Sequence, residues 1–379
     1  MRVTQEGLYR NMIANIQKKI EDISTYNEQI SSGKKLLYLS DNPIDGAELI
    51  KFKKTLSDIE QFNRDITMGN TWLKSTQNAL ENVESQVRSA KSLTEQLATE
   101  TYDYSNRLDV SYTIDSIASE IMQTANTDIN GKHIFSGFKT DSQPFAIPDS
   151  AFSATGSGGH TFTVSGYNHD FDLDLRIEAI DATHYKFSVD GGNTYIDNNG
   201  TGFTFGSVNS ILGFTISVTG GAATANETAS FDIKHEYQGD EGDIKIETNK
   251  GEKVTVNLQG NDVFTSSDNK NIFKIMGNLW AGVKTNNRNL ISEQLPKLTN
   301  FEKHDLKMQA FTGASLNRLD TIKNDILLKD KESTESSVSD LEDVDISDVM
   351  TKLMLSQTVY QASLRATSMI TNLNITNFI

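Results

Sequence analysis

The sequence contains no cysteine among its 379 residues and only four prolines. The lack of cysteine excludes disulfide staples and cysteine-ligated metals. Basic residues are also scarce, since 35 lysines and arginines face 51 acidic residues and leave a net charge of −16. This balance argues against nucleic acid as a partner, because binding phosphates requires a basic face. Only 36% of the residues are hydrophobic, which favours thin, extended packing over one large globule.

The sequence shows neither the pattern of a cleaved signal peptide nor that of a membrane-spanning helix. The start, Met-Arg-Val-Thr-Gln-Glu, lacks the apolar core of a signal peptide, so we expect no cleaved export signal. After Lys352 the only charged residue is Arg365. However, 12 of the last 27 residues are Ser, Thr, Asn or Gln, too polar for a spanning helix. The same stretch lacks the basic face of an interfacial helix, and we expect no membrane insertion.

Both ends of the chain carry amphipathic helical patterns. Near the start the apolar positions recur at steps of three and four, with Asn27 in the remaining slot: Ile13, Ile16, Ile20, Ile23 and Ile30. Near the end the corresponding positions, with Gln357 in the seam, are Ile346, Met350, Leu353, Tyr360 and Leu364. Apolar character continues through Ile370, Leu373 and Ile375 to Phe378 and Ile379. Coiled-coil seams at both ends need burial, first against each other and then against other copies. This is the organisation of a polymer subunit.

Further helices are expected on both flanks of the chain's middle. The first should span residues 3–32 and end at Gly33, and the second should open at Pro43 with Asp41 or Asn42 as its cap. A third is predicted from about residue 108 to 129. Beyond the middle, we expect helices over 272–283 and 289–329, with Pro296 ending or kinking the latter near its beginning. The acidic segment 332–345 is predicted to break the pattern before the last helix.

The middle of the chain has a strand pattern. Residues 141–265 hold 16 of the 25 glycines, and 18 acidic against 6 basic residues. Alternating apolar residues predict strands near 171–177, 185–189, 214–218 and 254–258, with a tight turn at 190–193. A hairpin is predicted where residues 134–137 and 144–145 flank a turn. The alternation favours an antiparallel sheet or sandwich that faces water on one side.

These patterns predict an α+β fold: a discontinuous long-helix coiled-coil rod built from both termini, with an inserted antiparallel β domain. We expect three domains. Residues 1–42 and 338–379 form a terminal coiled-coil assembly domain. Residues 43–140 and 268–337 form a helical rod domain with a hairpin, and residues 141–267 form an outer β domain.

Several separate stretches resemble the flagellin superfamily, and within it the hook–filament junction branch. The opening Met-Arg-Val-Thr is typical of that branch, whereas flagellins usually begin with Met-Ala. The family's Ser-Gly-Lys and Ser-Asp-x-Pro signatures match residues 31–34 and 40–43. Further matches, which extend the resemblance over residues 1–145 and 270–379, lie at 134–141, 144–145, 341–346, 361–364 and 377–379. Asn42 stands where many members have Asp, and asparagine is also a good cap.

The resemblance implies a structural protein without catalysis, cofactor or metal. Members are exported unfolded through the flagellar secretion channel and form a ring between hook-associated protein 1 and the first flagellin. The implied partners are thus other copies of the chain, hook-associated protein 1, flagellin, the flagellar export apparatus and an export chaperone. The residues expected to make assembly contacts, with ordinary intrachain core as the alternative at each position, are Ile13, Ile16, Ile20, Ile23, Ile30, Leu353, Tyr360, Leu364, Ile370, Leu373 and Phe378.

Other interpretations remain open. The chain could be the flagellin filament subunit itself, although its opening residues argue against this, or an adhesin that carries a binding module on a helical stalk. Asp172 and Asp174 fall on one predicted strand face, as a glycosidase pair would, but an acidic exposed sheet usually has such residues for solubility. The acidic residues between 340 and 348 lack the spacing of a calcium loop, and we expect them to favour a helix N-terminus. The six histidines show no ligand spacing.

Overall fold

A computed structural model describes residues 5–38, 40, 42–99, 104–147, 151–267 and 269–376. The chain divides into two compact units. The terminal unit comprises residues 1–64 and 322–379, and the central unit comprises residues 65–321. The helix α2 (Pro43–Ala98) begins in the terminal unit and continues into the central one.

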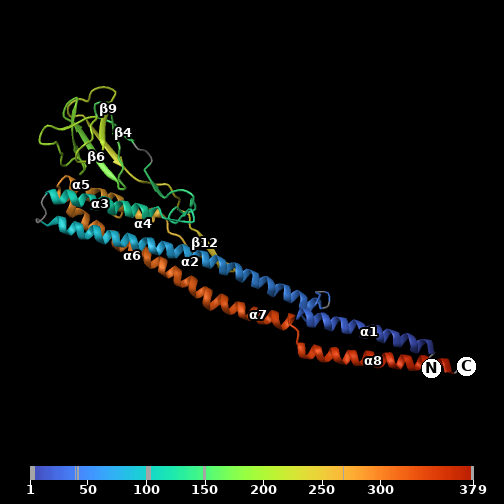
Figure 1. The fold of residues 1–379 in the computed structure, drawn as a ribbon. Coiled ribbons are helices and arrows are strands. Elements are labelled where there is room, and N and C mark those ends of the chain that lie inside the picture. Colours follow the sequence, from blue (N-terminus) through green and yellow to red (C-terminus); the bar gives the residue numbers. More distant parts are fainter. Residues whose placement is uncertain are drawn as a thin grey trace. The chain divides into compact units, whose positions relative to one another are not determined.

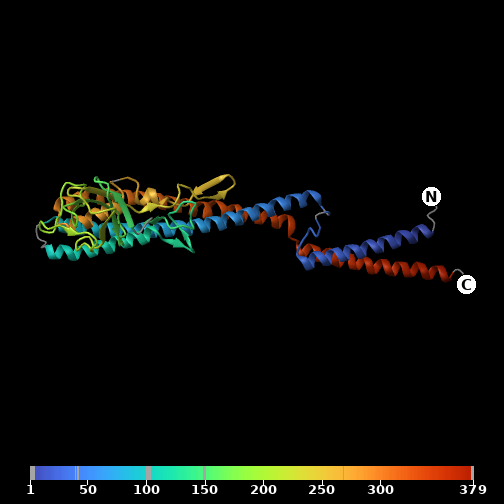
Figure 2. The same cartoon turned by 90° about the horizontal axis from the view of Figure 1, so that it is seen from above.

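Helices make up most of the terminal unit. Besides the start of α2, they are α1 (Gln5–Ser32), the π-helical segment η1 (Ile322–Leu327), α7 (Leu328–Glu342) and α8 (Ile346–Thr376). α1 and α8 lie side by side and run antiparallel (Figures 1 and 2). The predicted end of α1 is confirmed, because Gly33 adopts a left-handed φ of +70° directly after Ser32. Asn42 caps α2, since its Oδ1 accepts hydrogen bonds from the backbone N–H groups of Ile44 and Asp45.

Glu342 ties together the segments at one end of the α1–α8 pair. Its buried carboxylate lies 2.6 Å from the Nζ atoms of both Lys34 and Lys53. Its backbone oxygen accepts a 2.7 Å hydrogen bond from the N–H of Lys35, and the N–H of Val344 donates to the Gly33 oxygen. The hydrogen bonds from Lys34 and Lys53 lower the pKa of the Glu342 carboxyl. The chain that leaves α1 and the chain that enters α8 are therefore fixed to each other.

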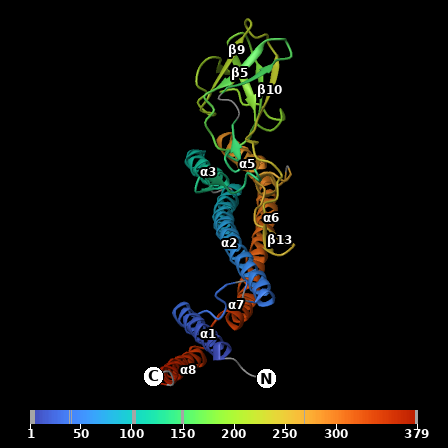
Figure 3. The same ribbon diagram turned by 90° about the vertical axis from the view of Figure 1, so that its right-hand side faces the viewer.

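The central unit combines helices with antiparallel strands. Its other helices are α3 (Tyr104–Ala125), α4 (Gly260–Phe264), α5 (Ile272–Lys284) and α6 (Arg288–Thr321). α5 packs against α3, α6 and the strand β6. The two larger sheets lie on one side of α5 (Figures 1 and 3). The rings of Phe171 and Trp280, 5.1 Å apart, join the strands to α5 in one apolar core.

All the strand pairs are antiparallel. One sheet has the order β10-β6-β7-β8, with bounds Thr228–Ile233, Leu173–Ala179, His184–Ser188 and Phe203–Thr204. The second has the order β4-β5-β9, with bounds Ala151–Thr155, Thr161–Ser165 and Thr215–Thr219. Three two-stranded pairs complete the set: β1 (Asp128–Ile129) with β2 (Lys132–His133), β3 (Phe145–Ala146) with β11 (Glu236–Tyr237), and β12 (Lys245–Asn249) with β13 (Glu252–Thr255). Along β6, buried side chains alternate with partly exposed ones, as the sequence predicts.

Some predicted boundaries are wrong. The third helix ends at Ala125, because Ile129 belongs to a hairpin whose turn is Asn130-Gly131, both with positive φ. The hairpin therefore precedes the predicted one, and β3 pairs with the distant β11. Pro296 lies inside α6, which does not end there. Helical structure also continues through η1 and α7 as far as Glu342, so the acidic segment breaks only at residues 343–345.

The predicted fold class is confirmed. Long helices from both ends of the sequence flank an inserted antiparallel β region.

Candidate assembly surface

The facing sides of α1 and α8 form two rows with coiled-coil spacing. In both rows the intervals alternate between four and three residues, which is the spacing of the a and d positions of a heptad. The row on α1, all partly buried, consists of Met12, Ile16, Lys19, Ile23, Tyr26 and Ile30. The row on α8, buried or partly buried, consists of Val349, Leu353, Ser356, Tyr360, Ser363 and Thr367. We call these residues the inner rows.

Polar contacts support the beginning of α8. The Asp345 carboxylate accepts hydrogen bonds from the backbone N–H groups of Ser347 and Asp348 and so caps the helix. One turn on, Lys352 Nζ lies 2.5 Å from the Asp348 carboxylate, which raises the pKa of Lys352. Asp345 and Asp348 therefore act as cap and first-turn charge, the role expected for acidic residues at a helix N-terminus, whereas Glu342 pairs with Lys34 and Lys53 instead.

Directly beside the inner rows lies a strip of exposed apolar side chains. Ile13 and Ile20 on α1 are 39% and 49% exposed, and Met350 and Leu364 on α8 are 44% and 43% exposed. Each follows a d position of its inner row and therefore occupies an e position. In an antiparallel pair the e positions of both helices flank the seam on the same side, because one helix is traversed in the opposite sense. These four residues therefore form one surface, which we call the outer strip.

The opposite flank of α8 is also apolar. Leu355, Val359 and Met369 are exposed there, and α8 has only three charged residues in 31. A helix with exposed apolar side chains on both flanks of its buried row has more apolar surface than one partner helix covers. α1 covers only the inner row of α8, so α8 has the composition of a helix that requires further partners.

The structure separates the predicted assembly residues into three groups. Those in the inner rows are Ile16, Ile23, Ile30, Leu353 and Tyr360, whereas Ile13, Ile20 and Leu364 lie in the outer strip. The side chains of Ile370 and Leu373, and Phe378 altogether, lie outside the described residues. The seam predicted on α8 is rotated relative to the observed one, since Val349 and Ser356 are buried while Ile346 and Met350 are exposed.

Asp172 is a buried structural residue and not part of an exposed acidic pair. Its Oδ1 accepts from the backbone N–H of His235 and lies 3.1 Å from Nδ1 of the same histidine, and its Oδ2 accepts from Asn271 Nδ2. Asp174 pairs with Lys274 at 3.2 Å, and burial raises its pKa. The partners of Asp172 in this cluster are 63 and 99 residues away in the sequence and match no motif, so no local pattern predicts the cluster.

Glu227 organises a second buried cluster at the edge of the β region. Its carboxylate accepts hydrogen bonds from the backbone N–H groups of Gly158, His160 and Thr224, and lies 2.8 Å from His160 Nδ1. Burial opposes ionisation, but the hydrogen bonds from His160 and Thr224 outweigh it and lower the pKa of Glu227 to about 2. The glycine-rich turn at 156–159 is therefore held by a carboxylate.

Neither cluster offers a metal site, and the described residues contain no group of three or more His, Asp or Glu side chains arranged to hold a metal ion. Among the helices that the structure describes, none is both long and apolar enough to cross a membrane. The exposed apolar surface of the α1–α8 pair is therefore the strongest candidate for the functional site.

Comparisons with known proteins point to one family. The bacterial flagellin N-terminal helical region matches residues 3–140, and the C-terminal helical region matches residues 303–379, together more than half of the chain. Flagellar hook-associated protein 3 of Escherichia coli K12 is 22% identical over 147 residues, which is 38% of this chain and 46% of that protein. The Salmonella typhimurium LT2 protein of the same name is 24% identical over 146 residues, with the same two coverages. The chain thus spans less than half the length of these curated relatives.

A solved structure supports the fold. A protein of Vibrio parahaemolyticus, described as a flagellar hook-associated protein, aligns with 80% of this chain and 100% of its own, with a TM-score of 0.53 and 15% sequence identity. At this identity the likeness concerns the fold alone. The N- and C-terminal helical regions of flagellin match the parts of the chain that contain α1, α8 and the helices next to them. The chain therefore belongs to the flagellin family of bacterial flagellar structural proteins.

Proposed function

We propose that the protein is a structural subunit of the bacterial flagellum and forms the junction ring that joins the hook, through hook-associated protein 1, to the flagellin filament. Family membership and the names of the curated relatives support the flagellar role. The observation that carries the proposal is the outer strip, a set of apolar side chains left exposed on helices that already pair with each other. Exposed apolar patches of this kind mark association surfaces, and a subunit that assembles side by side requires one.

Burial of the outer strip supplies a useful part of the assembly energy. Burying a whole Leu, Ile or Met side chain is worth about 1.5–3 kcal/mol, and these four are about half exposed, so covering them gives roughly 3–5 kcal/mol per subunit. This is too little to drive association alone but enough to select the correct partner face.

The same surface suits export and delayed assembly. Terminal helices that lack their neighbours are poorly stabilised, so in this proposal the chain passes through the secretion channel unfolded, guarded by an export chaperone. The ends then order fully when neighbouring subunits cover them. The three-domain division proposed from the sequence, with an outer β domain facing solvent, fits this arrangement.

Immunogold electron microscopy of intact cells, with antibody against residues 146–265, tests the assignment. A single band where hook meets filament is expected. Label along the whole filament would instead identify the protein as a flagellin filament subunit. Label absent from the flagellum would favour the interpretation as an adhesin on a helical stalk.

Paired substitutions test the surface itself. Ile20→Asp with Leu364→Asp is expected to abolish filament attachment in cells that lack the native protein, with an unchanged helical signal in circular dichroism. Gln17→Asp is the matched control, since Gln17 is exposed on α1 outside both the inner row and the outer strip. Normal attachment by the double variant would show that the strip is not an assembly contact.

A further inference from the structure

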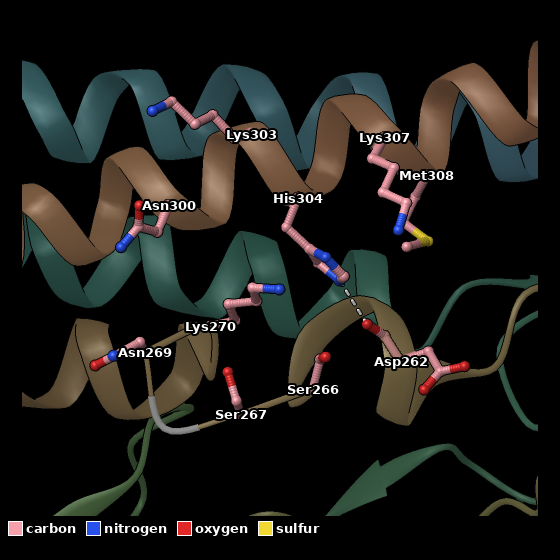
Figure 4. A pocket seen from close by; sticks show the side chains of 10 residues that line it. All are labelled: Asp262, Ser266, Ser267, Asn269, Lys270, Asn300, Lys303, His304, Lys307 and Met308. Atoms are coloured by element: carbon pink, nitrogen blue, oxygen red, sulfur yellow. Dashed lines mark hydrogen bonds between the residues drawn. The ribbon is translucent and has the colours of Figure 1, made fainter.

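A groove of about 660 Å³ in the central unit is lined by an unusual concentration of lysines. One wall is a single face of α6, and the other is the loop between α4 and α5 (Figure 4). The residues that line it are Asp262, Ser266, Ser267, Asn269, Lys270, Asn300, Lys303, His304, Lys307 and Met308. Three lysines thus gather at one place in a chain with a net charge of −16.

The lysines are available for a ligand. No ion pair joins Lys270, Lys303 or Lys307 to any carboxylate in the described ranges, whereas Lys91, Lys186 and Lys274, elsewhere in the central unit, do pair with carboxylates. Figure 4 shows the side chains of Lys270 and Lys307 on either side of His304, whereas the Lys303 amino group points away from it. Asp262 is the one described carboxylate of the lining, and Asp268, in the same loop, is outside the described residues.

The groove is held open by fixed contacts. His304 is buried, and its Nε2 donates a 2.6 Å hydrogen bond to the Asp262 backbone oxygen, which ties α6 to α4. The Lys270 backbone N–H donates to the Ser267 oxygen, which closes the loop, and Asn271 caps α5 immediately afterwards. The lysines therefore project from a scaffold that needs no rearrangement before binding.

The length of the groove selects the kind of anion. The residues on α6 occupy positions 300, 303, 304, 307 and 308, one face of the helix over about 12 Å at 1.5 Å per residue. An extended peptide advances about 3.3 Å per residue, so roughly four residues fit along this face. A phosphate or sulfate ion would fill only a small part of the volume. Serine hydroxyls and asparagine amides along the walls can bind a peptide backbone.

We propose that this groove binds an extended acidic peptide segment of a partner protein, with Lys270 and Lys307 pairing with its carboxylates. The inference does not rest on the junction role, because the groove is formed entirely by the central unit. A long polyanion such as nucleic acid is disfavoured, since the chain's net charge of −16 would repel phosphates that extend beyond the groove.

The test uses the full-length chain and two labelled hexapeptides, one of glutamate and one of glutamine, with binding followed by fluorescence anisotropy. The glutamate peptide is expected to bind with a Kd below about 1 mM and the glutamine peptide far more weakly. The variant Lys270→Gln with Lys307→Gln should weaken binding at least tenfold, whereas Lys270→Arg with Lys307→Arg should retain it. Lys74→Gln is the control, since Lys74 is an exposed lysine of α2 outside the groove.

Three results would overturn the proposal: no measurable binding of the glutamate peptide, equal binding of the two peptides, or equal loss in the Lys74 variant. Displacement by millimolar inorganic phosphate would show a general oxyanion site instead. Tighter binding of a short single-stranded oligonucleotide than of the glutamate peptide would show that the ligand of the groove is a nucleic acid and not a peptide.

Discussion

Alanine at Gly277 is expected to destabilise the central unit, although alanine is the better helix former. Gly277 lies in the middle of α5, where that helix meets the start of β6. An added methyl carbon would overlap the Asp172 carbonyl oxygen, and would lie 2.9 Å from its carbonyl carbon and 3.2 Å from Phe171 Cδ2. Normal carbon contacts begin near 3.5 Å, so the contact with the carbonyl carbon alone would require α5 to retreat from the strand by about 0.6 Å, and clearing the overlapping oxygen requires more.

The magnitude follows from three contributions. Replacing glycine by alanine in a helix gains about 1 kcal/mol. Overpacking a close contact costs about 1–3 kcal/mol. The retreat also stretches two hydrogen bonds, from the Asp172 N–H to the Phe273 oxygen and from Asn271 Nδ2 to the Asp172 carboxylate, each worth about 0.5–1.5 kcal/mol. The net loss is roughly 1–5 kcal/mol, or a fall in Tm of roughly 2–20 °C for a unit of this size.

Thermal unfolding followed by tryptophan fluorescence measures the effect where it occurs, because Trp280 is buried on the same helix against Phe171. Gly313→Ala is the matched control. Gly313 is also inside a helix, α6, but an added Cβ there meets no atom within 4 Å, so the variant should gain up to about 1 kcal/mol. The two substitutions are thus expected to have opposite signs. If Gly277→Ala raised the Tm as Gly313→Ala does, the close approach of α5 to the strand would not exist.

Three further predictions concern carboxyl groups. The folded-state pKa of Glu227 lies below its ordinary value of 4.5, so its contribution is complete above pH 4.5 and is lost as the pH falls towards 2. Glu227→Gln should therefore cost roughly 2–3 kcal/mol at pH 7 in urea titrations, and the difference should vanish near pH 2. Burial raises the pKa of Asp305 to about 7. Ionisation of this carboxyl group therefore disfavours folding increasingly as the pH rises above 3.8. Asp305→Asn should stabilise the protein at pH 8, by at most roughly 4 kcal/mol, and should change its stability little at pH 4. In the terminal unit, Glu342→Gln weakens both lysine pairs by roughly 1 kcal/mol in total, because the lysines are half exposed, and should speed hydrogen exchange at the amides of Lys35 and Val344.

Features that depend on neighbouring residues could be predicted from the sequence. Gly33 ends α1 because only its own φ is needed, and Asn42 caps α2 through bonds to residues two and three positions on. The strands β6, β7 and β9 fall within two residues of their predicted positions, since alternation is a local property. The segment 332–342 was predicted wrongly because its acidic and serine-rich composition resembles a break, yet glutamate is a good helix former and the helix only has to continue from η1.

Features that depend on a partner helix could not be predicted. Along α8, apolar residues occur on both sides of the inner row, so periodicity alone fits several seams. The choice of Val349 and Ser356 over Ile346 and Met350 is set by the surface of α1, which the pattern of α8 does not contain. The lysine groove was missed for a similar reason: Lys303, His304 and Lys307 share a helix face, but the opposing loop is brought there only by the packing of α4.

The distribution of apolar side chains explains why the two units need different partners. The largest fully buried side chains all belong to the central unit: Tyr185, Phe135, Phe145, Phe162, Phe171, Phe187, Phe214, Phe264, Phe273, Phe301, Ile66 and Leu73. Of the 20 large hydrophobic residues that are exposed in the described part of the chain, 14 belong to the terminal unit, although that unit is less than half as long. A central unit with its own aromatic core can fold before any neighbour arrives. The terminal unit has little core to hold it, because apolar side chains of α8 and the outer strip stay exposed. In the proposed assembly, neighbouring subunits that cover these side chains would also stabilise the terminal unit, since a partner that binds only the folded chain favours folding.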